Sequence, residues 1–133
     1  MKNEYGHMNT SVSMINYYVI FCPRYRRKIF LIPGVESRFK ELVIQICERN
    51  DFELIALECD KDHGHLFVNT PPTFSATDVV RIVKTNTAKV LLREFKEFSL
   101  TQNLWTRNYF ASMAGNVCSE TIKKYVESQK KRS

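Results

Sequence analysis

The segment 14-MINYYVIFC-22 is dense in β-branched and aromatic residues, and Pro23 follows it directly. Side chains of these types fit the pleated, half-buried surface of a sheet, and a proline interrupts the ladder of hydrogen bonds. We predict a first β-strand over residues 14–22, beside which the rest of the chain has to be placed.

Downstream of this strand the pattern changes to that of a helix and then back again. After Pro33-Gly34, apolar residues recur at i, i+3, i+4, i+7 and i+8, namely Phe39, Leu42, Val43, Ile46 and Cys47. This spacing predicts a helix with one apolar face that ends near Asn50. Residues 52–59 and 65–69 have the composition of two further strands, and the polar turn Asp60-Lys61-Asp62 between them predicts a hairpin.

The second half of the chain repeats this alternation. Ser75 and Asp78 form the pattern of a capping box, which predicts a helix through about Phe95. The expected inner side of this helix carries Val79, Val83 and Val90, and its outer side carries Arg81, Lys89 and Arg93. A short strand over residues 109–113, a turn at Gly115-Asn116 and a last helix over residues 119–130 complete the series.

The predicted order is β-α-β-β-α-β followed by a helix. This is the split βαβ arrangement of the α+β ferredoxin-like (RRM-like) folds, in which an antiparallel sheet carries helices on one face. The 133 residues suit a single domain, in which we expect residues 1–12 to be flexible. The open face of such a sheet is a common platform for single-stranded nucleic acid.

Composition narrows the class of protein. Hydrophobic residues make up 44% of the chain and charged residues 26%, which suits a globular core and excludes an intrinsically disordered chain. Because no apolar run approaches the about 20 residues that cross a bilayer, and the N-terminus lacks the apolar core of a signal peptide, we expect a cytoplasmic protein without a membrane partner. The four cysteines form no C-x-x-C pair, which argues against a zinc ribbon or a disulfide framework.

The charge points to a polyanionic partner, since the chain carries a net charge of +6. Four of the five residues from Arg24 to Lys28 are basic, and a second cluster closes the chain at Lys130, Lys131 and Arg132. For the second cluster, a solvated surface without a partner is at least as good an interpretation.

Two histidines, His63 and His65, lie two residues apart where a strand is expected to begin. The period of two sends both imidazoles to one face of the sheet and Gly64 to the other, which is what two ligands of one metal require. A hydrogen-bonded histidine pair without a metal remains the alternative on this motif alone.

The last predicted helix places Tyr125 and Gln129 on one face with Ile122 and Val126. A tyrosine on an apolar face is usually a core residue, and taken alone Tyr125 fits that interpretation. Gln129 needs a partner for its amide, and a metal held by two histidines would supply one.

Four separated stretches together resemble a known family: CPRYRRK (residues 22–28), DHGHLFV (62–68), LWTRNYF (104–110) and IKKYVESQ (122–129). Their order and spacing are similar to those of the single-tyrosine HUH transposases, small enzymes carried by insertion sequences of the IS-two-hundred/IS-six-hundred-and-five type. The resemblance extends over residues 14–129 and implies the same fold.

The resemblance also implies the chemistry. His63 and His65 would be the metal ligands, Gln129 would complete a site for Mg²⁺ or Mn²⁺, and Tyr125 would be the nucleophile. The expected reaction cleaves and rejoins single-stranded DNA at hairpin-bearing ends through a 5′-phosphotyrosine. Asp60 and Asp62 would orient the imidazoles or only cap the hairpin.

For DNA binding we expect phosphate contacts from Arg24, Arg26, Arg27 and Lys28, with Arg81, Lys84 and Lys89 as weaker candidates. Tyr25 and Tyr109 would stack on bases or serve in packing. The family implies a homodimer with joined sheets and active sites shared between subunits, whereas the sequence leaves assembly in cis or in trans open.

The sequence departs from the family at Gly64, where relatives carry a bulky apolar residue. We expect glycine to leave a gap beneath the sheet and a looser metal site. Two alternatives stay open: a non-catalytic single-stranded nucleic-acid-binding protein on the same fold, and a metal-dependent hydrolase that uses the two histidines alone.

Overall fold

The computed structural model describes residues 14–107 and 110–113. Their regular elements, in chain order, are β1 (Ile15–Phe21), α2 (Val35–Asn50), β2 (Glu53–Asp60), β3 (His63–Thr70), α3 (Ala76–Glu94) and β4 (Phe110–Met113). Short 3-10 helices lie in the connections: η1 (Arg24–Arg26), η2 (Ile29–Leu31) and η3 (Lys96–Phe98). No helix among the described residues is long and apolar enough to span a membrane.

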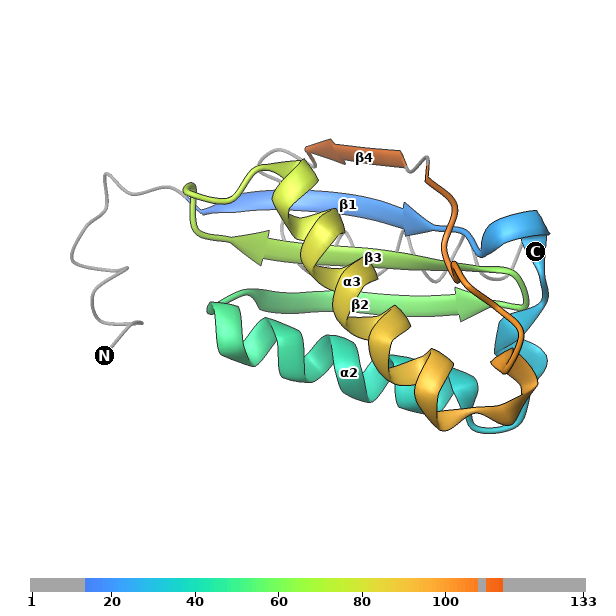
Figure 1. Cartoon of the computed structure of the whole chain (residues 1–133). Helices are drawn as coiled ribbons and strands as arrows, with labels where there is room; N and C mark the ends of the chain where they lie inside the picture. Colours follow the sequence, from blue (N-terminus) through green and yellow to red (C-terminus); the bar gives the residue numbers. More distant parts are fainter. Residues whose placement is uncertain (1–13, 108–109, 114–133) are drawn as a thin grey trace.

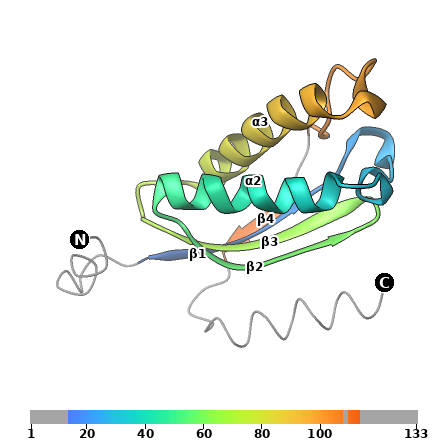
Figure 2. The same ribbon diagram turned by 90° about the horizontal axis from the view of Figure 1, so that it is seen from below.

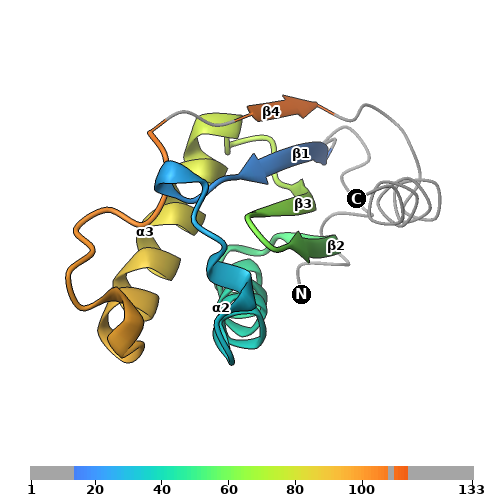
Figure 3. The ribbon, with the colours of Figure 1, turned by 90° about the vertical axis from the view of Figure 1, so that its right-hand side faces the viewer.

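The four strands form one antiparallel sheet in the order β2-β3-β1-β4 (Figure 1). Helices α2 and α3 both lie on the same face of this sheet (Figure 2). The end-on view in Figure 3 shows the same two layers, with the strands on one side and the helices on the other. The α+β ferredoxin-like fold predicted from the sequence is therefore confirmed.

The core lies between the sheet and the two helices. Helix α2 buries its predicted apolar face, and Val79 and Val83 of α3 are buried as predicted, with Val90 packed half-buried beside them. Trp105 packs against Phe21 and contributes to this core, and its indole Nε1 donates a hydrogen bond of 3.0 Å to the Thr87 hydroxyl. This bond ties the segment before β4 to α3, so β4 reaches the edge of the sheet beside β1.

The capping box that opens α3 has the geometry expected from the sequence. The Ser75 hydroxyl accepts a bond of 3.1 Å from the Asp78 backbone N–H, and the Asp78 carboxylate accepts one of 2.9 Å from the Ser75 N–H. The last strand begins at Phe110 in the described part of the chain. The predicted flexible N-terminus, Tyr109, the turn at Gly115-Asn116 and the last helix lie outside the described residues.

Strand alternation gives the central sheet two distinct faces. Tyr17 of β1 points toward the helices, where its hydroxyl donates a hydrogen bond of 2.9 Å to the Phe74 carbonyl. Its neighbour Tyr18 points to the opposite, outer face and stacks on Phe67 of β3. The two consecutive tyrosines therefore lie on opposite faces of the sheet and make different contacts.

The gap expected beneath Gly64 does not exist. Gly64 faces the helices, and a Cβ built there would lie 3.6 Å from Cε2 of Phe39 and 3.7 Å from Sγ of Cys59. Both distances are ordinary van der Waals contacts, and the Phe39 ring is fully buried. The α2 phenylalanine fills the space that a larger side chain would take, so this part of the expectation was wrong.

Candidate functional site

The two histidines of β3 lie side by side on the outer face of the sheet, as the period of two predicted. The ring centroids of His63 and His65 are 4.7 Å apart, and the ring planes meet at 73°. In the hairpin register His63 pairs with Asp60, and His65 pairs with Glu58. Directly opposed residues of antiparallel strands share a face, so β2 adds two carboxylates to the surroundings of the imidazoles.

Asp60 stands among the candidate metal ligands and is not confined to an orienting role. Its Oδ2 lies 3.4 Å from Nε2 of His63. One ligand atom each from Asp60, His63 and His65 can be chosen so that all lie within 4.8 Å of one another. Two imidazoles and a carboxylate form a donor set suited to a divalent ion such as Mn²⁺ or Mg²⁺.

Each imidazole is held through its Nδ1 atom. Asp62 places Oδ1 2.9 Å from Nδ1 of His63, which matches the orienting role expected for this carboxylate. Nδ1 of His65 lies 2.6 Å from the hydroxyl of Tyr18, a residue that the sequence did not single out. Partners at both Nδ1 atoms make the Nε2 atoms the candidate ligand atoms of the pair.

The electrostatics favour the protonation states that metal binding requires. Burial lowers the pKa of His65, the charge of His63 lowers it further, and Asp60 and Glu58 act in the opposite direction. The hydrogen bond to His63 holds the pKa of Asp62 below its usual range, and Arg26 adds to this effect. A neutral imidazole and an ionised carboxylate therefore coexist at neutral pH.

The basic cluster of residues 24–28 adjoins this group of side chains. Nη2 of Arg26 lies 3.3 Å from Oδ2 of Asp62, whose other oxygen contacts His63. The Arg26 side chain remains 59% exposed, so its guanidinium is open to a further anion. One carboxylate thus connects the expected phosphate-binding surface to the expected metal ligands.

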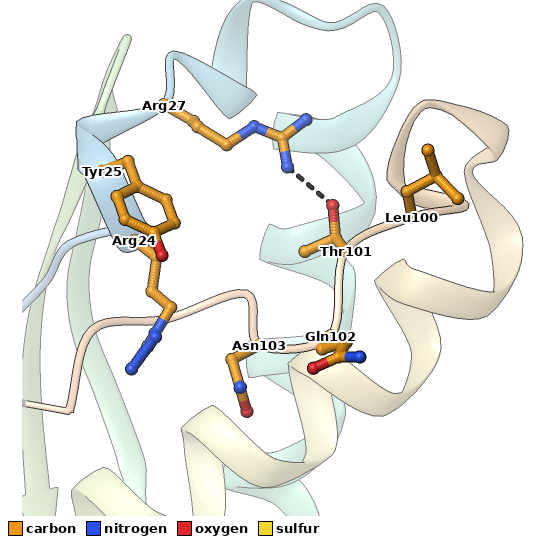
Figure 4. A pocket seen from close by; sticks show the side chains of 7 residues that line it. All are labelled: Arg24, Tyr25, Arg27, Leu100, Thr101, Gln102 and Asn103. Carbon is orange, nitrogen blue, oxygen red and sulfur yellow. Dashed lines mark hydrogen bonds between the residues drawn. The ribbon is translucent and has the colours of Figure 1, made fainter.

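A second feature of the basic cluster is a cavity of about 310 Å³ beside η1. Figure 4 shows Arg24, Tyr25 and Arg27 on one side of it and the segment 100–103 on the other. Arg27 donates a hydrogen bond of 2.7 Å to the Thr101 hydroxyl and lies 5.4 Å from the centre of the Phe98 ring. Lys28 lines a neighbouring hollow with Arg26 and Arg27.

Tyr25 is displayed to solvent in an uncommon backbone conformation. Its φ angle is 61° and that of Arg26 is 51°, while 87% of the Tyr25 side chain is exposed. A left-handed conformation at a bulky residue is uncommon and stores strain. The turn therefore holds an aromatic ring outward beside guanidinium groups, an arrangement suited to a stacked base and its phosphate.

The weaker DNA-binding candidates on α3 lie in three different settings. Arg81 is exposed and contacts Asp78 at 3.1 Å, and Lys89 is exposed. The ammonium of Lys84 donates to the carbonyls of Thr106 and Arg107, and burial lowers its pKa, so this lysine supports the segment before β4.

Arg107, which the sequence did not indicate, lines a hollow with Arg24 and Tyr25 and adds a cation to the basic surface. Tyr125, Gln129 and Tyr109 lie outside the described residues.

Comparisons with known proteins identify the family of this chain. The family model described as "Transposase IS200 like" matches residues 11–129. The ISDra2 transposase TnpA of Deinococcus radiodurans is 30% identical over 132 residues, which cover 97% of this chain and 91% of that protein. A transposase for insertion sequence element IS200 from Salmonella typhimurium is 25% identical, covering 85% of this chain and 75% of that one.

Solved structures extend the likeness to the fold. A transposase structure from Deinococcus radiodurans has a TM-score of 0.69 at 28% identity, covering 89% of this chain and 92% of that one. A REP-associated tyrosine transposase bound to a REP hairpin has a TM-score of 0.61 at 15% identity, covering 88% and 63%. Since the family model spans nearly the whole sequence, the chain belongs to the IS200-like transposase family.

Proposed function

We propose that this transposase cleaves and rejoins single-stranded DNA at hairpin-bearing ends through a 5′-phosphotyrosine, with a divalent metal at the outer sheet face. The observation that carries the proposal is the convergence of Asp60, His63 and His65 within 4.8 Å. In a family of DNA strand transferases, a metal ion bound by this cluster would stabilise the charge that develops on the phosphodiester during transfer.

The donor set fits Mg²⁺ or Mn²⁺. His63, His65 and Asp60 would hold the ion, with Gln129 proposed as a further ligand through its amide oxygen. When bound, the ion supplies Lewis-acid polarisation of a phosphate oxygen. Asp62 and Tyr18 contact the Nδ1 atoms of His63 and His65, respectively, and keep the two imidazoles in place.

Tyr125 is the proposed nucleophile. Its phenol loses a proton, and its oxygen forms a bond to the phosphorus while the bond between phosphorus and the 3′ oxygen breaks. The 3′ oxygen leaves as a hydroxyl after taking up a proton, and the 5′ phosphate stays on Tyr125. Attack by a 3′-hydroxyl on this phosphotyrosine reverses the step and rejoins the strands.

The basic surface around η1 is the proposed DNA-binding site. Four cations contribute to this surface, namely Arg24, Arg26, Arg27 and Lys28, and Arg26 contacts Asp62 next to His63. The cavity next to Tyr25 is large enough for a base. A structural relative is bound to a REP hairpin, which supports a DNA hairpin as the ligand of this fold. We assign Arg81 and Lys89 a lesser part in binding and Lys84 a supporting one.

We propose that the enzyme acts as a homodimer whose active sites are shared between subunits and that it works in the cytoplasm. A site shared between subunits can be tested by mixing two inactive variants. Mixing a Tyr125→Phe chain with a chain that lacks both His63 and His65 should restore some activity if each active site draws on two subunits.

The test is a denaturing gel of the full-length protein with labelled single strands from the DNA that flanks its gene. Wild type and Tyr125→Phe are compared with Mg²⁺, with Mn²⁺ and with chelator. The proposal predicts an adduct that survives denaturation and needs both metal and Tyr125. DNA binding without adduct or cleavage in either metal would favour a non-catalytic binding protein, and free 5′ ends without adduct would favour a hydrolase.

A further inference from the structure

Tyr18 occupies a fixed place in the middle of the outer sheet face. It stands opposite Phe67 in the register of β1 and β3, and the two rings stack with centroids 4.3 Å apart and planes at 11°. On its other side, Phe110 of β4 meets the ring edge-on at 5.9 Å and 72°. Strands on both sides of β1 therefore restrain the tyrosine ring.

From this place the phenol reaches diagonally across the β1–β3 pair to a candidate metal ligand. His65 lies two residues before Phe67 on β3, and the Tyr18 oxygen is 2.6 Å from its Nδ1 atom. The two rings are nearly parallel, at 7° with centroids 5.9 Å apart. A hydrogen bond to Nδ1 opposes a flip of the imidazole ring, because the flip would replace Nδ1 by a carbon atom that cannot make this bond.

The bond also bears on which nitrogen carries the proton. A neutral imidazole has one N–H, and the other nitrogen keeps the lone pair that a metal needs. When Nδ1–H donates a hydrogen bond to the phenol oxygen, the free lone pair lies on Nε2 of His65. Hydrogen bonds of this kind set the tautomer and the orientation of metal-binding histidines.

We infer that Tyr18 is a positioning residue for His65: its hydroxyl oxygen accepts a hydrogen bond from the Nδ1–H group and so presents Nε2 to the divalent ion. The inference rests on the proposed function for the identity of that ion. In this role Tyr18 acts through His65, and its ring contacts with Phe67 and Phe110 keep it from following a displaced imidazole.

The chain offers a matched control in the preceding residue. Tyr17 also carries a hydroxyl, but its hydrogen bond goes to the Phe74 carbonyl on the helix-covered face. Tyr17→Phe and Tyr18→Phe each delete one oxygen from β1 and keep the ring. A general loss of stability affects both variants, whereas an effect on His65 belongs to Tyr18 alone.

Two readouts on the full-length protein test the inference. The first is the tautomer of His65 in the metal-free protein above pH 7.5, from long-range proton–nitrogen NMR. The second is Mn²⁺ affinity from calorimetry. Wild type and Tyr17→Phe should hold the proton on Nδ1 and bind Mn²⁺ alike. Tyr18→Phe should move the proton toward Nε2 and lose about 10- to 100-fold in Mn²⁺ affinity, the usual effect of removing such a partner.

The two proposals fail in different ways. An unchanged tautomer and unchanged Mn²⁺ affinity in Tyr18→Phe would overturn the role of Tyr18. Equal losses of Mn²⁺ affinity in Tyr17→Phe and Tyr18→Phe would also overturn it, because a general loss of stability would then explain both results. A wild-type protein that binds no Mn²⁺, yet shows the tautomer shift between variants, would overturn the metal centre of the proposed function instead.

Discussion

The two histidines of the candidate metal centre are held by opposite means. His65 sits on the central part of the sheet, where an uncharged phenol and stacked rings fix it. His63 sits at the hairpin end, where Asp62 holds it and Arg26 in turn contacts Asp62. One candidate ligand is thus fixed by an uncharged hydrogen bond and ring packing, and the other depends on charges that adjoin the basic surface.

Because of this difference, we expect the position of His63 to respond to salt and that of His65 to be insensitive to it. Packing is insensitive to salt, whereas exposed ion pairs are screened by it. A DNA phosphate that approaches Arg26 would compete with Asp62 for the same guanidinium. The His63 end of the centre is therefore where bound DNA and metal ligation would influence one another, and the His65 end is the fixed reference.

The largest effect should come from removing either ligand outright. His63→Ala and His65→Ala each delete one of two imidazole donors, so Mn²⁺ affinity should fall by more than the about 100-fold expected of a change beside a ligand. Both variants should lose Mn²⁺ binding in calorimetry and adduct formation on the denaturing gel. Retention of metal-dependent adduct by either one would break the assumption that the two histidines form a single centre.

The next effect distinguishes the two ends. Asp62→Asn weakens the hydrogen bond that orients His63, and we expect Mn²⁺ affinity to drop about 10- to 100-fold. The affinity of wild type should also fall with rising salt, while that of Asp62→Asn should respond less. Titrations at low and high ionic strength test this, and equal salt dependence would contradict an electrostatic hold on His63.

Arg26→Ala probes the link between the metal centre and DNA. If Arg26 contacts a phosphate, the slope of log affinity for single-stranded DNA against log salt should decrease by about one. Arg49→Ala, which removes an exposed arginine from α2 on the helix-covered side, is the control. Fluorescence anisotropy at several salt concentrations gives both slopes, and identical values would place Arg26 outside the DNA-binding surface.

Gly64 tests whether the packing beneath the ligands is as full as the structure indicates. A Cβ at this position makes only ordinary contacts with Phe39 and Cys59, so Gly64→Ala should be neutral or stabilise the protein by up to about 1 kcal/mol. Gly64→Leu should destabilise it by about 1–3 kcal/mol through overpacking. Urea denaturation measures both, and a stabilising leucine would show that room remains under the sheet.

The smallest expected effect is the pH dependence that His65 adds to folding. Its pKa in the folded state lies below the usual 6.5, chiefly because of burial. Above that pH the imidazole is neutral in both states. As the pH falls below it, the unfolded chain takes up the proton first and the free energy of unfolding decreases. His65→Gln should flatten the urea midpoints between about pH 7 and 5, and an unchanged profile would contradict this.

Local patterns were enough to predict the elements and part of the site. The period of two placed His63 and His65 on one face, and the capping box at Ser75 and Asp78 set the start of α3. Both features depend on residues close together in the chain. The resemblance to a known family implied the reaction, which these patterns alone left open.

The remaining contacts depend on strand register and on distant segments. Tyr18 meets His65 across 47 residues, and Arg27 meets Thr101 across 74 residues. Asp60 joins the ligands only because the hairpin register pairs it with His63. The gap expected at Gly64 was wrong for the same reason, since Phe39 reaches it from a different element.

The most direct test of the proposed metal centre is an anomalous difference map from crystals of the full-length protein grown with Mn²⁺. We expect one strong peak on the outer sheet face, bound by Nε2 of His63, Nε2 of His65 and a carboxylate oxygen of Asp60. In the same map, Nδ1 of His65 should keep its bond to Tyr18. A saturated crystal with no peak among these three residues, or with the ion bound through Nδ1 of either histidine, would contradict it.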